Sequence, residues 1–341
     1  MLYKIFRVRY YRVMDIISRL YNKAREKKGK IVLPEAVLDE RVMQACKKIV
    51  EDEMSELVLL GKPEQYPAEL RANPLVTIIN PSVYVRKVEM IKLLMQKRKK
   101  SKLTYEQASE MLQDPRYFAT MLVEMKEADG MVLGAYYTSA DALRPALQII
   151  KGKEGQRVVG SMLINRNDFI EPNLYLDVSL NENPNAQELA EIGVAGADFY
   201  RNVLNREPKV AFLSYSTYGS AQGELVEKVR TATFTAQEMA KEKDYIIEGE
   251  MQFDSAVVPE VARTKCPTSF IKGKANVFVF PDLNCGNIAY KIAQRLGKCQ
   301  AVGPIMLNFR YPVNDLSRGC SVKDIYDTVV ITKLQIEEGE N

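Results

Sequence analysis

The sequence predicts an α/β fold with two α/β domains, each containing a mainly parallel sheet. The chain has 341 residues, which exceeds one ordinary domain. Short runs of Val, Ile and Leu, typical of strands buried on both faces, alternate with helical patterns along most of its length. Strands and helices that alternate in this way form parallel sheets covered by helices.

Apolar runs bounded by polar residues or glycine predict the strands. The runs are 30–34, 56–61, 76–80, 130–134, 157–160, 209–213, 245–247, 277–280 and 302–305. The first helix is predicted over 15–28, where Ile16, Leu20 and Ala24 share one face. Further helices are predicted over 39–51 and from near Val83 to the basic run 96–102. The polar, glycine-bearing segment 151–156 is the best candidate for a domain boundary.

The charge of the chain is unevenly distributed. The net charge is +4, but residues 1–30 carry ten basic and two acidic side chains, which leaves 38 basic and 42 acidic side chains in the remaining 311 residues. Nucleic-acid binding is not expected, since it needs a basic face across the domain. No uninterrupted apolar run is long enough for a secretory signal or a membrane span, and an interfacial membrane helix over 1–13 is the weaker alternative.

Histidine is absent and cysteine is sparse. Without histidine, a Ser-His-Asp or Cys-His mechanism and a His-ligated metal are excluded, so any general base must be Asp, Glu, Lys, Tyr or Cys. The five cysteines form no Cys-x-x-Cys pair. We therefore expect free thiols in a reducing cytoplasm, and no metal site.

The segment 312–324 gathers the groups that suit chemistry on an anion. It contains the fixed cation Arg318, the hydroxyls of Ser317 and Ser321, the thiol of Cys320, and two carboxylates, with Gly319 to allow a tight turn. A simpler interpretation is a helix start, in which Ser321 is the N-cap and Asp324 its partner three residues on. A cap alone does not explain the turn before it.

This segment resembles the signature of the phosphate acetyltransferases, or phosphotransacetylases. The match covers 314–321 and the acid at 324, and three other motifs follow the family's order over about 30–332. They are 213–217, 249–254, and 280–284 with Gly286 and Asn287. The resemblance implies a fold like isocitrate or isopropylmalate dehydrogenase, with the active-site cleft between domains. It implies domain I over 14–152 and 306–341, domain II over 153–305, an N-terminal extension over 1–13, and a homodimer.

The resemblance also implies the reaction, which is reversible acetyl transfer between acetyl phosphate and coenzyme A by direct thiolate attack in a ternary complex. Asp324 matches the catalytic base, which takes the proton of the thiol. Arg318 would stabilise negative charge, and Ser317 would donate a hydrogen bond. No tightly bound cofactor is expected, and coenzyme A is a substrate. A thioester on Cys320 is the weaker alternative, since no histidine can activate it.

Two arginines match the coenzyme-binding arginines of the family. Arg98 lies in the basic run 96–102, and Arg144 lies in the helix after Ser139. Because coenzyme A is polyanionic, cations are expected along its path. The alternative for Arg98 is a solvated helix end whose cations complement the helix dipole.

Hydroxyl and amide side chains at helix starts and strand ends are the candidates for binding the phosphate of acetyl phosphate. Ser139 is a candidate cap for its helix, and such a helix start also attracts anions. The full set is Thr138, Ser139, Ser214, Asn284, Asn287 and Lys291. Glycine-rich nucleotide motifs are absent, which disfavours ATP and dinucleotides.

Departures from the family pattern leave the acyl preference open. Tyr136 and Tyr137 replace a segment that commonly carries a histidine, Leu307 and Asn308 replace a frequent Gln-Gly pair, and Ala36 replaces a glycine. Propionyl or butyryl phosphate is therefore an alternative substrate. A non-catalytic acyl-CoA-sensing domain of the same fold is the alternative outside enzymes, and a decarboxylating dehydrogenase is the least favoured.

Overall fold

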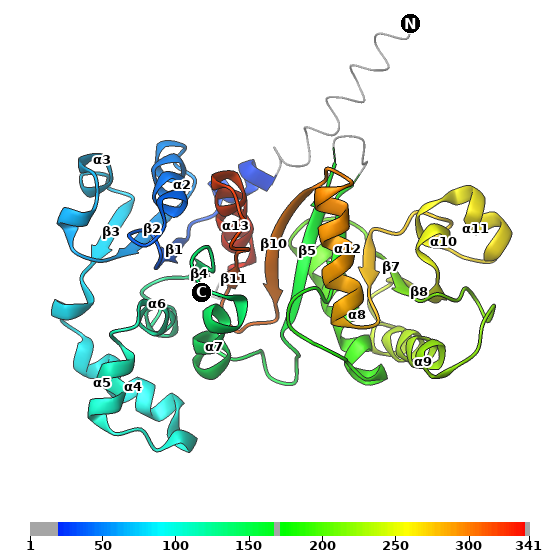
Figure 1. Ribbon diagram of the computed structural model, residues 1–341, viewed down its shortest axis with the longest axis horizontal. Coiled ribbons are helices and arrows are strands. Elements are labelled where there is room, and N and C mark those ends of the chain that lie inside the picture. Colours follow the sequence, from blue (N-terminus) through cyan, green and yellow to red (C-terminus); the bar gives the residue numbers. More distant parts are fainter. Residues whose placement is uncertain (1–19, 167–170, 338–341) are drawn as a thin grey trace, which may run out of the picture. The chain divides into compact units, whose positions relative to one another are not determined.

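The computed structural model describes residues 20–166 and 171–337 (Figure 1). The chain divides into two compact units, and each is described by itself. The first comprises the described residues of 17–153 and 309–341, and the second those of 154–308. The predicted extension over 1–13 lies outside the described residues.

The first unit contains a five-stranded parallel sheet with the strand order β11-β4-β1-β2-β3. Its strands are β1 (Lys30–Leu33), β2 (Glu56–Leu60), β3 (Val76–Ile79), β4 (Gly130–Leu133) and β11 (Val313–Asp315). Strand β11 comes from the C-terminal part of the chain and pairs with β4, so that Asp315 lies opposite Leu133. This pairing attaches the predicted catalytic segment to the sheet.

Helices cover both faces of this sheet (Figure 1). Helix α2 (Glu40–Glu51) packs against α13 (Val322–Gln335), and α6 (Pro115–Glu124) packs against α7 (Ser139–Ile149). The apolar residues of α2, including Ile49, recur at helical spacing and are buried. The remaining elements are a helical turn over 20–26, α3 (Ala68–Arg71), α4 (Lys87–Lys97), α5 (Tyr105–Met111), η1 (Pro63–Gln65), η2 (Pro81–Val83) and η3 (Lys99–Ser101).

The second unit contains a six-stranded mixed sheet with the strand order β10-β5-β6-β9-β7-β8. Its strands are β5 (Val159–Asn165), β6 (Asn173–Leu176), β7 (Lys209–Leu213), β8 (Ile246–Met251), β9 (Val277–Val279) and β10 (Gln300–Leu307). Strand β5 is antiparallel to both of its neighbours, and the other pairings are parallel. Because β7 and β9 are parallel neighbours, their carboxyl ends lie at the same edge of the sheet.

Helices α8 (Ala186–Asn202) and α9 (Glu224–Met239) pack together on this sheet. A methyl group on Gly193 or Gly196 of α8 would lie 2.3 Å from Phe212 or 2.0 Å from Leu176, so glycine lets α8 approach the sheet closely. The core cluster of the unit also includes Tyr290 of α12. Its remaining helices are α10 (Phe253–Val257), α11 (Pro259–Lys265) and α12 (Leu283–Arg295).

The predicted fold class is confirmed, because seven of the nine strand pairings are parallel. Each predicted strand is present, and β6 and β11 are two strands that the sequence did not predict. The helix expected from near Val83 begins at Lys87, because 81–83 forms a 3-10 turn. Among the described residues, no helix is long and apolar enough to cross a membrane.

Candidate active site

The predicted catalytic segment forms an exposed turn directly after β11. The N–H of Cys320 donates to the carbonyl of Ser317 at 2.8 Å, and the N–H of Gly319 donates to the Ser317 hydroxyl at 3.3 Å. Residues 317–319 are exposed, and Cys320 is buried. Within the described chain, the guanidinium of Arg318 has no ion-pair or hydrogen-bond partner. Its charge is therefore available to a ligand.

The predicted helix cap at Ser321 is confirmed. Ser321 is the N-cap of α13, its hydroxyl accepts from the N–H of Asp324 at 3.2 Å, and its N–H donates to Oδ2 of Asp324 at 2.8 Å. Asp324 is half-buried, and its other oxygen, Oδ1, accepts no hydrogen bond from the residues that the structure describes. The cap thus holds the carboxylate at the helix start and leaves one oxygen for a ligand.

The environment of Cys320 does not favour a nucleophile. The pKa of its thiol is raised to about 11, mainly by burial; Arg41 opposes the rise, and the carboxylates of Asp324 and Asp39 add to it. A thiol with this pKa is almost entirely protonated at neutral pH, and the thiolate is the reactive form. The environment of Cys320 therefore supports direct attack by the substrate thiol over an acetyl-enzyme.

The turn before α7 is held by a buried carboxylate that sequence reasoning missed. Glu35, which is 1% exposed, accepts from the N–H groups of Gly134 at 2.9 Å, Ala135 at 2.9 Å and Tyr136 at 3.3 Å. Burial raises the pKa of Glu35, and these N–H donors oppose the rise. Glu35 stands in the Leu-Pro-Glu sequence after β1. A carboxylate just after a central strand was the signal in the sequence that could have identified Glu35.

The cap of α7 is Thr138, and the prediction that Ser139 caps this helix is wrong. The N–H of Asp141 donates to the Thr138 hydroxyl at 3.3 Å, and that hydroxyl donates to the Asp141 carboxylate at 2.8 Å. Ser139 is instead the first helical residue, one position past the extended backbone that a cap requires. Both hydroxyls still lie at the helix start, where anions are favoured.

A second buried carboxylate, Asp315, ends β11 against the same turn. Asp315 is fully buried, and neither of its oxygens has a hydrogen-bond partner of ordinary geometry within the described chain. A methyl group on Gly134 would lie 2.1 Å from its Oδ1, so the two backbones meet closely. Burial raises the pKa of Asp315 to about 7, although the Ser139 hydroxyl and the Leu316 N–H lower it.

Asp315→Asn is expected to change how stability depends on pH. Between its ordinary pKa and about 7, folded Asp315 holds a proton that the unfolded chain releases. The free energy of unfolding should therefore fall as pH rises through this window, by up to about 1.4 kcal/mol per pH unit, relative to the always-neutral asparagine variant. Denaturant unfolding of both proteins at pH 5, 6 and 7 measures this. If the free energies of unfolding of the two proteins changed equally with pH, this prediction would be contradicted.

Both predicted coenzyme-binding arginines lie along helix α7. Arg98, at the C-terminal end of α4, donates to the side chains of Gln148 and, at 3.0 Å, Ser101. Arg144 pairs with Asp141 at 3.0 Å and is exposed. Since residues 144 and 148 lie one turn apart on α7, both guanidinium groups lie along the same face of that helix.

The remaining predicted residues lie in the second unit, at the carboxyl ends of two neighbouring strands. Ser214 follows β7, and its hydroxyl accepts from the N–H of Ser216 at 3.3 Å. Asn284 and Asn287 lie in the first turns of α12, after β9. Asn287 donates to the carbonyl of Val178 at 2.9 Å, and Lys291 donates to Asn287 at 2.6 Å. Asn284 is exposed.

The 249–254 motif stabilises the loop after β7. Glu250 is 2% exposed and accepts from the Ser216 hydroxyl at 2.9 Å, the Gly219 N–H at 2.8 Å and the Arg230 Nε at 3.2 Å. These donors hold the pKa of Glu250 below its ordinary value, although burial raises it. This motif thus shapes the hydroxyl-bearing turn that follows Ser214.

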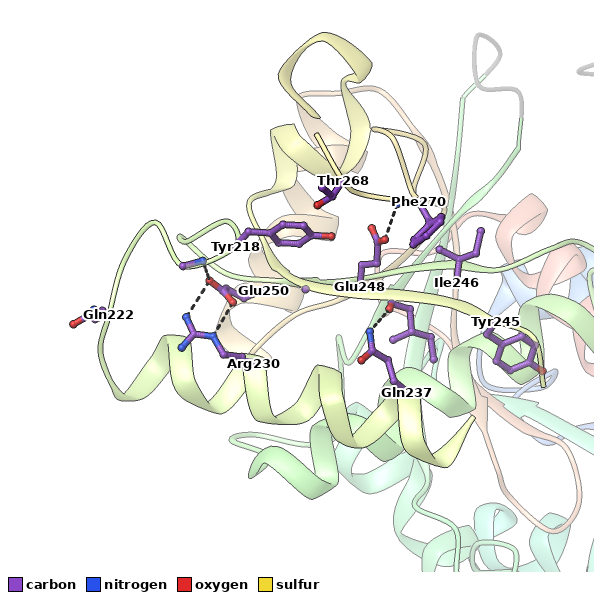
Figure 2. Close-up of a pocket in the computed structure, with 13 residues that line it drawn as sticks. Tyr218, Gln222, Arg230, Gln237, Tyr245, Ile246, Glu248, Glu250, Thr268 and Phe270 are labelled. Carbon is purple, nitrogen blue, oxygen red and sulfur yellow. Dashed lines mark hydrogen bonds and ion pairs between the residues drawn. The ribbon is translucent and has the colours of Figure 1, made fainter. Parts of the chain in front are cut away.

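A pocket of about 970 Å³ lies along β8 in the second unit (Figure 2). Figure 2 shows Arg230 and Glu250 paired at one end, and Gln237 bonded to the backbone of β8. None of the predicted site residues lines it. Among residues 20–166 and 171–337, no group of three or more Cys, Asp or Glu side chains has the geometry of a metal site.

Hydroxyl-bearing turns at the ends of parallel strands and at helix starts are typical of α/β proteins that bind phosphorylated ligands. The model of one family, phosphate acetyl/butaryl transferase, matches residues 15–333. The chain belongs to this family.

Characterised relatives match over nearly the full length. The phosphate acetyltransferase of Bacillus subtilis is 43% identical over 326 residues, which cover 94% of this chain and 99% of the relative. That of Thermoanaerobacterium thermosaccharolyticum is 43% identical, and the match covers 95% of this chain and all of the relative.

Solved structures of phosphotransacetylases are also similar to this chain. A phosphotransacetylase from Streptococcus pyogenes has a TM-score of 0.87 at 44% identity, and the match covers 95% of this chain and 98% of the other. The EutD phosphotransacetylase from Staphylococcus aureus has a TM-score of 0.85 at 42% identity, with coverage of 95% and 99%. A branched-chain phosphotransacylase from Enterococcus faecalis V583 shares the fold alone, with a TM-score of 0.64 at 15% identity and coverage of 90% and 99%.

Proposed function

We propose that this chain catalyses the reversible transfer of an acetyl group between acetyl phosphate and coenzyme A. The observation that carries the proposal is the exposed turn at 317–319, whose unpaired Arg318 lies six residues before Asp324 at the start of α13. The family match, and relatives 43% identical over nearly all of the chain, support this reaction. The enzyme is an acyltransferase, and coenzyme A is its substrate.

In the proposed mechanism, the thiol of coenzyme A gives its proton to Asp324. The thiolate then attacks the carbonyl carbon of acetyl phosphate, so that a C–S bond forms and the C–O bond to phosphate breaks. Arg318 stabilises the oxyanion and the departing phosphate, and Ser317 donates a hydrogen bond to the carbonyl oxygen. The exposure of the Ser317 and Arg318 side chains and the high pKa of Cys320 support direct attack.

We propose that Arg98 and Arg144 bind the phosphates of coenzyme A, because both cations lie along α7. Residues at strand ends and helix starts are proposed to bind the phosphate of acetyl phosphate: Thr138 and Ser139 in the first unit, and Ser214, Asn284, Asn287 and Lys291 in the second. We also propose that 14–152 with 306–341, and 153–305, fold as two domains, which the two compact units support.

Thioester formation from acetyl phosphate and coenzyme A, followed by ultraviolet absorbance, tests the proposed function. We expect rapid thioester formation that persists when a chelator is added. No thioester from folded protein would reject the enzyme, and coenzyme A binding measured by calorimetry would then support the alternative of a sensing domain.

A longer acyl phosphate is the second candidate substrate, because the matched family includes both acetyl and butyryl transferases. Tyr136 and Tyr137, which replace the usual residues beside Thr138, contact each other edge-to-face with ring centroids 5.1 Å apart. The ratio of kcat/KM among acetyl, propionyl and butyryl phosphate decides between the candidates. A higher value for butyryl phosphate would overturn the acetyl assignment.

Arg98→Ala is expected to raise the KM for coenzyme A at least about tenfold, because lost charge-assisted hydrogen bonds to phosphate are worth about 1.5–3 kcal/mol. The KM for acetyl phosphate should stay near that of the wild type. Steady-state kinetics with each substrate varied in turn measure both values. Arg86→Ala is the matched control, since Arg86 lies at the other end of α4 and pairs with Glu89 at 2.6 Å. An unchanged KM for coenzyme A would favour the alternative interpretation, in which Arg98 belongs to a solvated helix end.

We also propose that the chain forms a homodimer, as the family resemblance implies. Strand β8 is an edge strand in the described sheet, and an edge strand presents backbone N–H and C=O groups with which another chain can pair. Phe234 of α9 is 65% exposed, and Phe270 beside the pocket is 75% exposed (Figure 2). Light scattering of the purified protein tests the dimer, and a monomer at all concentrations would exclude it.

A further inference from the structure

Arg41 contacts two segments of the first unit that are far from it, and from each other, in the sequence. It lies in the first turn of α2, and its Nη1 donates to the carbonyls of Arg318 and Cys320, each at 2.8 Å. Its Nη2 donates to the carbonyl of Ala135 at 3.0 Å. Arg41 therefore connects α2 both to the catalytic turn and to the turn that leads into α7.

Asp39 fixes the orientation of this guanidinium. Nε of Arg41 donates to Oδ1 of Asp39 at 3.0 Å, and Nη2 donates to Oδ2 at 2.7 Å, which is a bidentate pair. Asp39 is itself fixed, because its carboxylate is the N-cap of α2 and accepts from the N–H of Arg41 at 2.9 Å. The five side-chain N–H donors of Arg41 thus all have acceptors.

The two carbonyls that Arg41 binds in the catalytic turn lie on either side of Gly319. The Arg318 side chain has no partner of its own within the described chain, so its direction depends on the backbone of this turn. Fixing both carbonyls fixes that backbone. A lysine in place of Arg41 could not reproduce these contacts, because an ammonium lacks the planar fork.

We propose that Arg41, held by Asp39, is a positioning residue that orients Arg318 and Ser317 for the transfer. This inference rests on the proposed function. Arg41 does not touch the reacting atoms in this proposal and acts through the backbone of the 317–320 turn. Misplacement of a catalytic group by about 1 Å can lower a rate by about a hundredfold.

Arg41→Lys is expected to lower kcat at least about tenfold, with the KM for coenzyme A within about twofold of the wild type, because misplaced catalytic groups slow the chemical step without removing the coenzyme-binding arginines. Arg201→Ala in the second unit is the matched control. Arg201 also donates to two backbone carbonyls, those of Lys243 at 2.6 Å and Asp244 at 3.4 Å. It should leave kcat unchanged, and a wild-type kcat in folded Arg41→Lys would overturn the proposal.

A double variant separates positioning from a general structural role. Because Arg41 acts through Arg318 and Ser317, Arg41→Lys should slow Arg318→Ala by a clearly smaller factor than it slows the wild type. Fully multiplied losses would show that Arg41 acts independently of Arg318 and would overturn the proposal.

Hydrogen exchange gives a readout that does not need turnover. The Cys320 amide, bonded to the Ser317 carbonyl at 2.8 Å, should exchange at least about tenfold faster in Arg41→Lys, because the turn opens more often. Unchanged exchange would reject the positioning role. If the wild-type protein formed no thioester but exchange in Arg41→Lys increased as expected, only the proposed function would be rejected.

Discussion

Arg318→Ala is expected to lower kcat at least about a hundredfold, the usual scale for the loss of one preorganised charge at a transition state. The guanidinium is exposed and unpaired within the described chain, so its replacement breaks no internal contact. Stability should therefore stay near that of the wild type. Steady-state thioester formation and thermal unfolding measure the two properties.

The controls for Arg318 separate its geometry from its charge. Arg318→Lys keeps the charge but loses the fork, and should remain well below the wild type. Arg263→Ala removes another exposed arginine, which pairs with Glu260 at 3.1 Å, and should leave kcat unchanged. Near-normal turnover in folded Arg318→Ala would remove this residue from the mechanism.

Asp324→Asn is the second substitution with a large expected effect, and kcat should again fall at least about a hundredfold. The asparagine carbonyl oxygen can still accept from the N–H of Ser321, so the start of α13 should be retained. The variant therefore removes the proton acceptor and keeps the cap. Turnover measured from pH 6 to pH 9 should rise with pH in the variant, because the fraction of coenzyme A present as thiolate rises.

Ser321→Ala is the complementary control, because it removes the cap and keeps the carboxylate. It should lower the free energy of unfolding by about 1 kcal/mol, which is typical for a lost N-cap. Turnover should change much less than in Asp324→Asn. If the two variants had equal effects on kcat, Asp324 would act only through the helix cap.

The sequence was sufficient for features that depend on local patterns. Apolar runs such as 209–213 predicted their strands, and the spacing of Ser321 and Asp324 predicted the cap. Strand β11 was missed because its polar residue Asp315 is buried, although polar residues usually indicate a loop. Strand β6, Asn-Leu-Tyr-Leu, was missed because it lacks the Val and Ile residues that indicated predicted strands of similar length, such as β1 and β3.

The residues that hold the turns could not be predicted locally, because their partners are distant in the sequence. Arg41 and the carbonyl of Arg318 are 277 positions apart, and Glu35 is 99 positions from Gly134. The periodic patterns of a single sequence do not encode contacts between residues so far apart. An arginine two positions after a helix-capping aspartate was visible, but its backbone targets were not.

The placement of β11 has a consequence for the order of synthesis. This strand and the turn after it leave the ribosome after the whole segment 154–308, and the described sheet of the first unit remains one strand short until they emerge. The segment 154–308 is complete earlier and can fold first. A chain cut before Val313 would lack this strand and, with it, Ser317, Arg318 and Asp324 together.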